Sequence, residues 1–215
     1  MHATRALLVL ALPLLLSACN PPSPPAQSTI EILADDYLAA MMKQDPLMGT
    51  YYSIAGARHD HLPDNSLAAL EAWAAEEDAF LARLNAIEPP TEVGSRDWVS
   101  YGLLKEQLEA SVDYRVCRDE LWQAAAATSW HTELPFVFDV QPLGTPDLHQ
   151  QALSRLGEVA GYIDNEIANL SLGLELGYSA PRVTVNAVPT QIRALIGEDS
   201  IFLGPARRSD DPAFA

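Results

Sequence analysis

The stretch from residue 145 to residue 177 constrains the fold most strongly. Thr145-Pro146-Asp147 places a capping hydroxyl, a proline suited to the first helical position and an acid at one helix start. Apolar residues then recur at helical spacing on one face: Leu153, Leu156, Ala160, Ile163, Ile167, Leu170 and Leu174. This pattern predicts one long amphipathic helix that ends around 173–177.

Shorter helices are predicted before this one by capping residues and by prolines. Ser28-Thr29-Ile30-Glu31 is a capping box, and Asp45-Pro46 ends the helix that it begins. Ser66 can cap a second helix that runs to about residue 87, and Ser95 a third. Because the link between the second and third helices is short, they should form an antiparallel hairpin.

A last helix is predicted from Pro181 to about Gly197, with a kink at the internal Pro189. No segment alternates apolar and polar residues as a half-buried strand does. The predicted fold class is therefore all-α, an irregular helical array with antiparallel helix hairpins and no significant sheet.

Two irregular stretches hold the candidate functional residues. The first, 46–65, contains His59 and His61, which two residues apart in a loop could both reach a cation; the alternative is a solvated loop. The second, 122–144, loses helical periodicity, and Pro135 and Pro142 argue against a continuous helix there. Three of its residues could line a cleft or instead plug a gap between helices: Trp130, His131 and Glu133.

The amino terminus carries the features of a bacterial lipoprotein. Leu16-Ser17-Ala18-Cys19 reads as a lipobox, preceded by Arg5 and an apolar run too short to span a bilayer. We expect residues 1–18 to be a signal peptide, Cys19 to be lipidated, 19–27 to be a proline-rich tether and 28–215 to be a helical domain. Asn20 after the cysteine favours the outer membrane, with the protein facing the periplasm.

The composition excludes some partners and the motif search excludes some chemistries. A net charge of −16 repels phosphate backbones, so nucleic acid is not an expected partner. No nucleophile elbow, phosphate-binding loop, His-Glu-x-x-His or Cys-x-x-Cys motif is present. Consequently no catalytic residue, metal-ligand set or cofactor is assigned to this chain.

Several short stretches together resemble one bacterial family, over nearly all of residues 29–205. They are Asp45-Pro46 with Gly56 and Leu62-Pro63-Asp64; Tyr101-x-x-Leu104 with Gln107-Leu108-Glu109; Gln141-Pro142 with Gly144-Thr145; Arg155-Leu156 through Tyr162-Ile163-Asp164; Gly173; Gly177-Tyr178-Ser179-Ala180-Pro181-Arg182; and Gln191-Ile192. Their order and spacing resemble those of the family called domain of unknown function 885 (DUF885).

The resemblance implies a helical, often lipid-anchored or secreted protein similar to gluzincin-type zinc peptidases. In that family the zinc residues lie far downstream in a longer chain, and no residue here matches them. The chain would then be the N-terminal helical part, which walls or caps a cleft for a peptide substrate, and zinc is expected only in a full-length protein. The alternative is a self-sufficient, non-enzymatic lipoprotein that binds or tethers a partner at the cell envelope.

The last residues favour a fragment. Ser209-Asp210-Asp211-Pro212 has the features of a helix start, but an isolated helix of one turn is not stable in water. We therefore expect the natural chain to continue beyond residue 215.

Overall fold

The computed structural model describes residues 27–212 and 214, and every regular element among them is helical. The first four helices are α1 (Thr29–Gln44), α2 (Leu47–Tyr51), α3 (Leu67–Asn85) and α4 (Arg96–Tyr114). Two 3₁₀ turns follow, η1 (Arg115–Cys117) and η2 (Asp119–Leu121), and then α5 (Trp130–Asp139) and α6 (Pro146–Glu175). The last elements are α7 (Arg182–Val185), α8 (Val188–Ala194), η3 (Ile201–Leu203) and α9 (Gly204–Arg208). The all-α prediction is confirmed.

The predicted helix starts are confirmed by their caps. The Ser28, Ser66, Ser95 and Thr145 hydroxyls each accept a hydrogen bond from a backbone N–H three residues on, at 3.1–3.3 Å. At Ser28 the box is complete, because Glu31 accepts a bond from the Ser28 backbone N–H at 3.1 Å. Local sequence therefore sets where these four helices begin.

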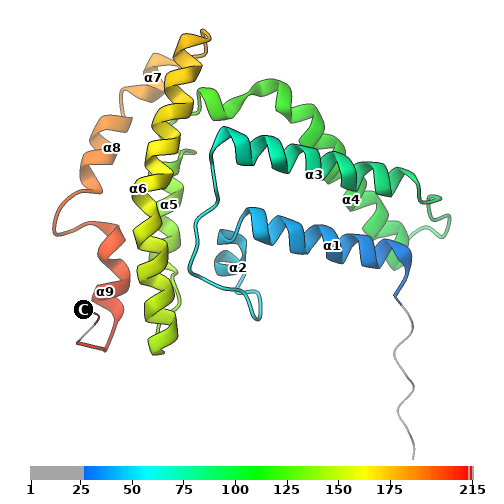
Figure 1. The fold of residues 1–215 in the computed structure, drawn as a ribbon, viewed down its shortest axis with the longest axis horizontal. Helices are drawn as coiled ribbons and strands as arrows, with labels where there is room; N and C mark the ends of the chain where they lie inside the picture. Colours follow the sequence, from blue (N-terminus) through cyan, green and yellow to red (C-terminus); the bar gives the residue numbers. More distant parts are fainter. Residues whose placement is uncertain (1–26, 213, 215) are drawn as a thin grey trace, which may run out of the picture.

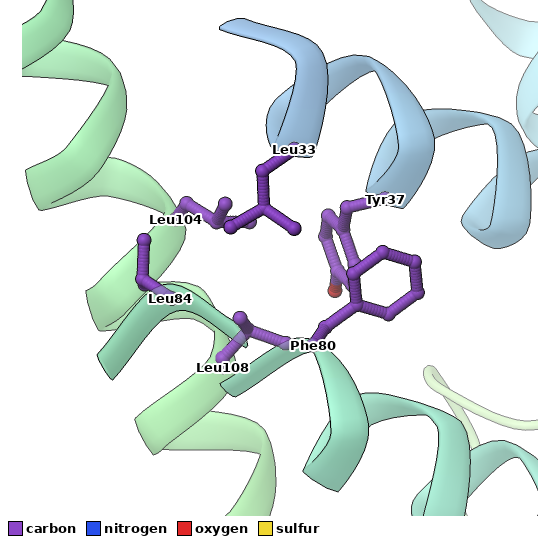
Figure 2. Packing of buried hydrophobic residues seen from close by; sticks show 6 residues of the cluster. All are labelled: Leu33, Tyr37, Phe80, Leu84, Leu104 and Leu108. Carbon is purple, nitrogen blue, oxygen red and sulfur yellow. The ribbon is translucent and has the colours of Figure 1, made fainter. Parts of the chain in front are cut away.

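The first core joins α1, α3 and α4 at one end of the molecule (Figure 1). Side chains from the three helices point toward one another in Figure 2: Leu33, Tyr37, Phe80, Leu84, Leu104 and Leu108. The Tyr37 and Phe80 rings meet edge to face with centroids 5.3 Å apart. Burial of these large apolar groups holds the predicted α3–α4 hairpin against α1.

The second core lies around α5 and contains four buried residues: Leu62, Leu134, Val137 and Phe138. Phe202 of η3 packs on Phe138 edge to face, with ring centroids 5.1 Å apart. Helix α5 differs from the irregular stretch predicted there, and it holds Pro135 inside. Its buried apolar face outweighs the cost of the proline, a case of tertiary packing overriding local preference.

The carboxyl-terminal region also differs from the prediction of one helix kinked at Pro189. The chain forms two short helices, α7 and α8, which are separated at Asn186 and Ala187. Pro189 lies in the first turn of α8, where a missing N–H costs little, so the helix restarts before the proline instead of bending at it.

Helix α6 is confirmed in its length and its start, and it spans much of the height of Figure 1. The choice of residues that α6 buries is unusual. An apolar stripe normally faces a core, yet Leu153, Leu156, Ile167 and Leu174 are exposed. The residues that α6 buries are polar or small: Gln151, Ala152, Arg155, Asn169 and Gly173.

None of the helices in the described part of the chain is long and apolar enough to cross a membrane. Residues 1–26, which hold the predicted leader, Cys19 and most of the tether, lie outside the described residues.

Candidate functional site

The irregular segment 52–66 is fastened along α6 by polar side chains of that helix. The His59 backbone N–H donates to Gln151 Oε1 at 2.7 Å, and the Leu62 N–H donates to Glu158 Oε2 at 2.7 Å. Further along, Asn169 Nδ2 donates to the Asn65 carbonyl at 2.9 Å. These bonds supply the backbone partners that a segment without secondary structure otherwise lacks.

Arg155 is the centre of this polar junction and is fully buried. Its Nε donates to the His61 carbonyl at 3.0 Å, and its Nη1 donates to Thr50 Oγ1 at 3.0 Å and to Gln141 Oε1 at 2.7 Å. Burial lowers the pKa of Arg155 to about 10, so the guanidinium stays charged at neutral pH. It therefore ties α2, segment 52–66 and the start of the 140–145 link to α6.

Gln141 completes the junction from the other side. Its Nε2 donates to the His59 carbonyl at 3.0 Å, while its Oε1 accepts from Arg155. Sequence reasoning missed both Gln141 and Arg155 as parts of one network. The signal that could have found them is the presence of a lone arginine among the inward positions of an otherwise acidic helix.

The two histidines of the first irregular stretch, His59 and His61, contact different partners. His59 Nδ1 is 2.9 Å from Thr50 Oγ1, and burial together with the nearby Arg155 charge lowers the pKa of His59. His61 is exposed; its Nδ1 is 2.7 Å from Glu158 Oε1 and its Nε2 is 3.7 Å from Asp60 Oδ2. Within the described residues no group of three or more histidine, cysteine, aspartate or glutamate side chains could hold a metal ion.

The candidates of the second stretch lie on the first turn of α5. His131 is buried, with its Nε2 3.1 Å from Gln191 Oε1 of α8. Trp130 is half-buried against the second core, and Glu133 is exposed. The structure thus brings these residues together on one helix, but His131 is bonded inward to α8 instead of being open to solvent.

The two irregular stretches meet where α2 contacts α5. The Tyr51 hydroxyl donates to the Glu133 carbonyl at 3.2 Å, and the Tyr51 and Phe136 rings stack with centroids 5.7 Å apart. Tyr52 is 72% exposed and Phe136 is 53% exposed. We call Tyr51, Tyr52 and Phe136 the aromatic patch. Desolvation, followed by the nearby Asp45 and Glu133 carboxylates, raises the pKa of Tyr51, so its hydroxyl remains a proton donor at neutral pH.

Two cavities flank α6 on other sides. A polar cavity of about 730 Å³ lies between α3, α4 and α6, and it includes Glu77, Arg115 and Glu166. Burial raises the pKa of Glu166, against the lowering effect of its hydrogen bond from Asn65. An apolar cavity of about 670 Å³ lies near the end of α6, bordered by Trp122, Leu174 and Val185. In the polar cavity the Ser111 hydroxyl donates to Glu77 Oε2 at 2.6 Å, and Arg115 Nη2 lies 3.3 Å from the same oxygen.

Comparison with known proteins agrees with the sequence resemblance. The family described as bacterial protein of unknown function (DUF885) matches residues 46–213, which is most of the chain. No curated protein matches the chain. The matched region begins at Pro46 and contains α2, the polar junction, the aromatic patch and all of α6. On this match the chain belongs to the DUF885 family.

Proposed function

We propose that this chain is the N-terminal helical region of a lipid-anchored envelope protein of zinc-peptidase type, and that it forms one wall of a cleft for peptide substrates. The proposal gives the chain no catalytic residue and no zinc of its own. Cys19 would anchor it to the outer membrane, with the helical region in the periplasm. Its basis is the family together with the likeness of DUF885 proteins to gluzincins.

The observation that carries the wall function is the aromatic patch. It is built from the two irregular stretches that sequence reasoning selected, and it leaves the Tyr52 and Phe136 side chains more than half exposed. Exposed aromatic rings offer large contact areas at low entropic cost, as a surface that recognises apolar side chains of a peptide requires. The Arg155 junction holds α2 in place beneath this patch.

Steady-state kinetics of the protein encoded by the intact gene test whether the aromatic patch forms part of the wall of a peptide-binding cleft. Phe136→Ala and Tyr52→Ala should raise KM for fluorogenic peptides severalfold and leave kcat within about twofold, because they remove binding and no chemical group. The matched control is Trp98→Ala, which removes an exposed aromatic side chain on α4, far along the chain from the patch. Equal effects of the control and the patch variants would refute a role for the patch in binding substrate.

Metal analysis separates the proposal from its alternative. The intact gene should encode a longer protein that binds zinc, whereas residues 1–215 should bind no stoichiometric zinc. One tightly held zinc per chain, lost when His59 and His61 are changed, would overturn this proposal and make the loop a metal site. A gene that stops at codon 215 and yields no peptidase would leave the alternative, a helical lipoprotein that tethers a partner.

A further inference from the structure

The apolar cavity at the carboxyl end of α6 is built from several elements. Leu121 of η2, which is fully buried, belongs to its lining, together with Leu170 and Leu174 from the last turns of α6 and Val185 from α7. Helix α7 lies beside this end of α6 in Figure 1. The cavity volume of about 670 Å³ falls within the range of small-molecule sites. The cavity is therefore large enough to hold a small ligand.

Most of the lining residues are apolar, and this limits the kind of ligand body that the cavity can hold. Even Trp122 offers a ligand only apolar surface, because its indole N–H already donates to the Cys117 carbonyl at 2.8 Å. An aliphatic chain needs no hydrogen bonds along its length, whereas a peptide brings amide groups that are costly to bury without partners. The lining therefore suits a hydrocarbon chain better than a peptide.

Two polar side chains of the lining come from α7 and its carboxyl end. Arg182 and Asn186 are four residues apart, so they lie on one face of this helical turn. Both are exposed, and among the described residues neither side chain has a hydrogen-bond or ion-pair partner. Arg182 is also the only charged residue of the lining. Two free hydrogen-bond donors therefore lie together at the edge of an apolar cavity.

These donors select the charge of the ligand. A guanidinium binds a carboxylate through two parallel hydrogen bonds, and the amide N–H of Asn186 can donate a further one. A phosphate monoester carries about two negative charges near neutral pH, whereas the single cation of this cavity offsets one. We propose that the cavity binds an aliphatic monocarboxylate, with its hydrocarbon chain against the leucines of η2 and α6 and its carboxylate on Arg182 and Asn186.

The charge of the whole molecule separates this site from general attraction of anions. The chain has a net charge of −16, so most of its surface repels an anion. Binding of a carboxylate must therefore come from contacts inside and at the edge of the cavity. The inference does not depend on the peptidase proposal, because the aromatic patch shares no residue with the cavity.

Isothermal titration calorimetry with octanoate, decanoate and octylammonium tests the proposal. The purified chain carries Cys19→Ser, so that no acyl chain of its own can compete for the cavity. Because two further methylenes are buried, decanoate should bind about tenfold more tightly than octanoate. Octylammonium has the chain length of octanoate and the opposite charge, and it should bind at least tenfold more weakly than octanoate.

Two exposed arginines supply a matched pair of variants for the carboxylate contact. Arg182→Gln should weaken binding of octanoate at least fivefold, because it removes the cation that meets the carboxylate. Arg193→Gln removes an exposed arginine of α8 that lies outside the lining, and it should leave the affinity within about twofold.

Two leucines supply a second pair for the chain contact. Leu174 borders the cavity, whereas Leu176, which is 57% exposed, lies outside the lining. Leu174→Ala should weaken binding of octanoate and decanoate by a similar factor of at least two, and Leu176→Ala should leave both affinities unchanged. Because both leucines and both arginines are exposed, none of the four changes should prevent folding, and circular dichroism checks this.

Four results would overturn the proposal. Equal loss of affinity in Arg182→Gln and Arg193→Gln would mean that only the net charge matters. Equal affinities for octanoate and decanoate would show that the cavity does not enclose the chain. Octylammonium binding as tightly as octanoate would show that no cation selects the ligand. An acetylated tri-leucine peptide with a free carboxyl terminus that binds more tightly than decanoate would make a peptide end the occupant. A failure of the peptidase kinetics above would leave this inference intact.

Discussion

At the residue scale, Arg155 shows how a charged group can serve as a structural centre. It is fully buried and makes hydrogen bonds to a backbone carbonyl, a hydroxyl and an amide instead of a carboxylate. Each acceptor comes from a different part of the chain, so the guanidinium adds polar links between α6, α2, segment 52–66 and Gln141. Burial of a charge is costly, and the bonds of Nε and Nη1 offset part of that cost, although the buried Nη2 has no hydrogen-bond partner among the described residues.

The substitution Arg155→Met tests how much the hydrogen bonds of Arg155 contribute to the free energy of unfolding. The substitution removes the Arg155 donors from the buried Thr50 Oγ1, Gln141 Oε1 and His61 carbonyl, and we expect it to lower the free energy of unfolding by about 3 kcal/mol. Urea denaturation followed by circular dichroism measures the change. Arg193→Met, at an exposed position of α8, is the control and should change stability by less than about 0.5 kcal/mol. Equal stability of both variants would show that the junction contributes nothing.

Glu166 links stability to pH. Burial raises its pKa above the ordinary value of 4.5, so the folded state binds this proton more tightly than the unfolded state does. The stabilising contribution of the protonated form is complete below pH 4.5 and is lost as pH rises through the folded pKa. Glu166→Gln, which still accepts from Asn65, should therefore be more stable than the wild type at pH 7.

The difference between Glu166→Gln and the wild type should shrink as pH falls toward about 4.5. Thermal melts over a pH series measure it. Glu175→Gln removes an exposed carboxylate near the end of the same helix and should show no such trend. A stability gain that does not depend on pH would contradict burial of the carboxylate as its cause.

At the element scale, the contact of α6 with η2 depends on a single glycine. A Cβ on Gly173 would lie 1.7 Å from the Leu121 carbonyl oxygen, whereas a Cβ on Gly157 of the same helix would meet nothing within 4 Å. Gly173→Ala must push backbone apart and should cost about 3 kcal/mol. Gly157→Ala should gain up to about 1 kcal/mol through helix propensity. Chemical denaturation measures the change in the free energy of unfolding for each variant. If both variants lost stability, or both gained it, the close approach of α6 to η2 at Gly173 would be contradicted.

Much of the element order could be predicted from the sequence, because it is encoded locally. The capping hydroxyls of Ser28, Ser66, Ser95 and Thr145 fix the starts of four helices through bonds that span three residues. The predictions that differed depend on distant partners. Helix α5 has a local start signal, because the Ser129 backbone N–H donates to Thr132 Oγ1 at 3.3 Å. Its continuation through Pro135 depends on the second core, which buries its apolar face.

The candidate site could be predicted only in part, for the same reason. Sequence reasoning selected the two irregular stretches, and the structure brings them together at Tyr51 and Phe136. It could not foresee that His59 and His61 bond to different partners or that His131 bonds inward to Gln191. Nor could it tell that α6 buries its polar side, because apolar periodicity reveals a face but not what lies against it.

At the scale of the whole molecule, the two cores are joined through polar contacts. The α1–α3–α4 core and the α5 core are connected by segment 52–66 and by the chain from η1 to α5, and Asn65 bonds to α6 at residues 162, 165 and 166. Polar junctions of this kind resist slippage because each bond is directional. The bonds of Asn65 hold the end of segment 52–66 against α6.

The lipid anchor gives a prediction for the complete protein. If Cys19 is acylated, membrane attachment is stable because more than one chain is added. Cys19→Ser should move the protein from the outer-membrane fraction to an unprocessed or soluble form, as judged by fractionation and intact mass. An Asn20→Ser change, which keeps the cysteine, should stay in the membrane fraction. An unchanged mass and fractionation on Cys19→Ser would exclude the lipobox.

The hydrogen bonds between segment 52–66 and α6 have a consequence for local opening of the native state. The amides of His59 and Leu62 donate to Gln151 and Glu158, acceptors that belong to α6. Their hydrogens can exchange with deuterated water only when those side-chain bonds open. We therefore expect both amides to exchange slowly, like those of a helix, although they lie in a stretch without regular structure. Gln151→Ala should release the His59 hydrogen while Leu62 remains protected, so the segment opens bond by bond along α6.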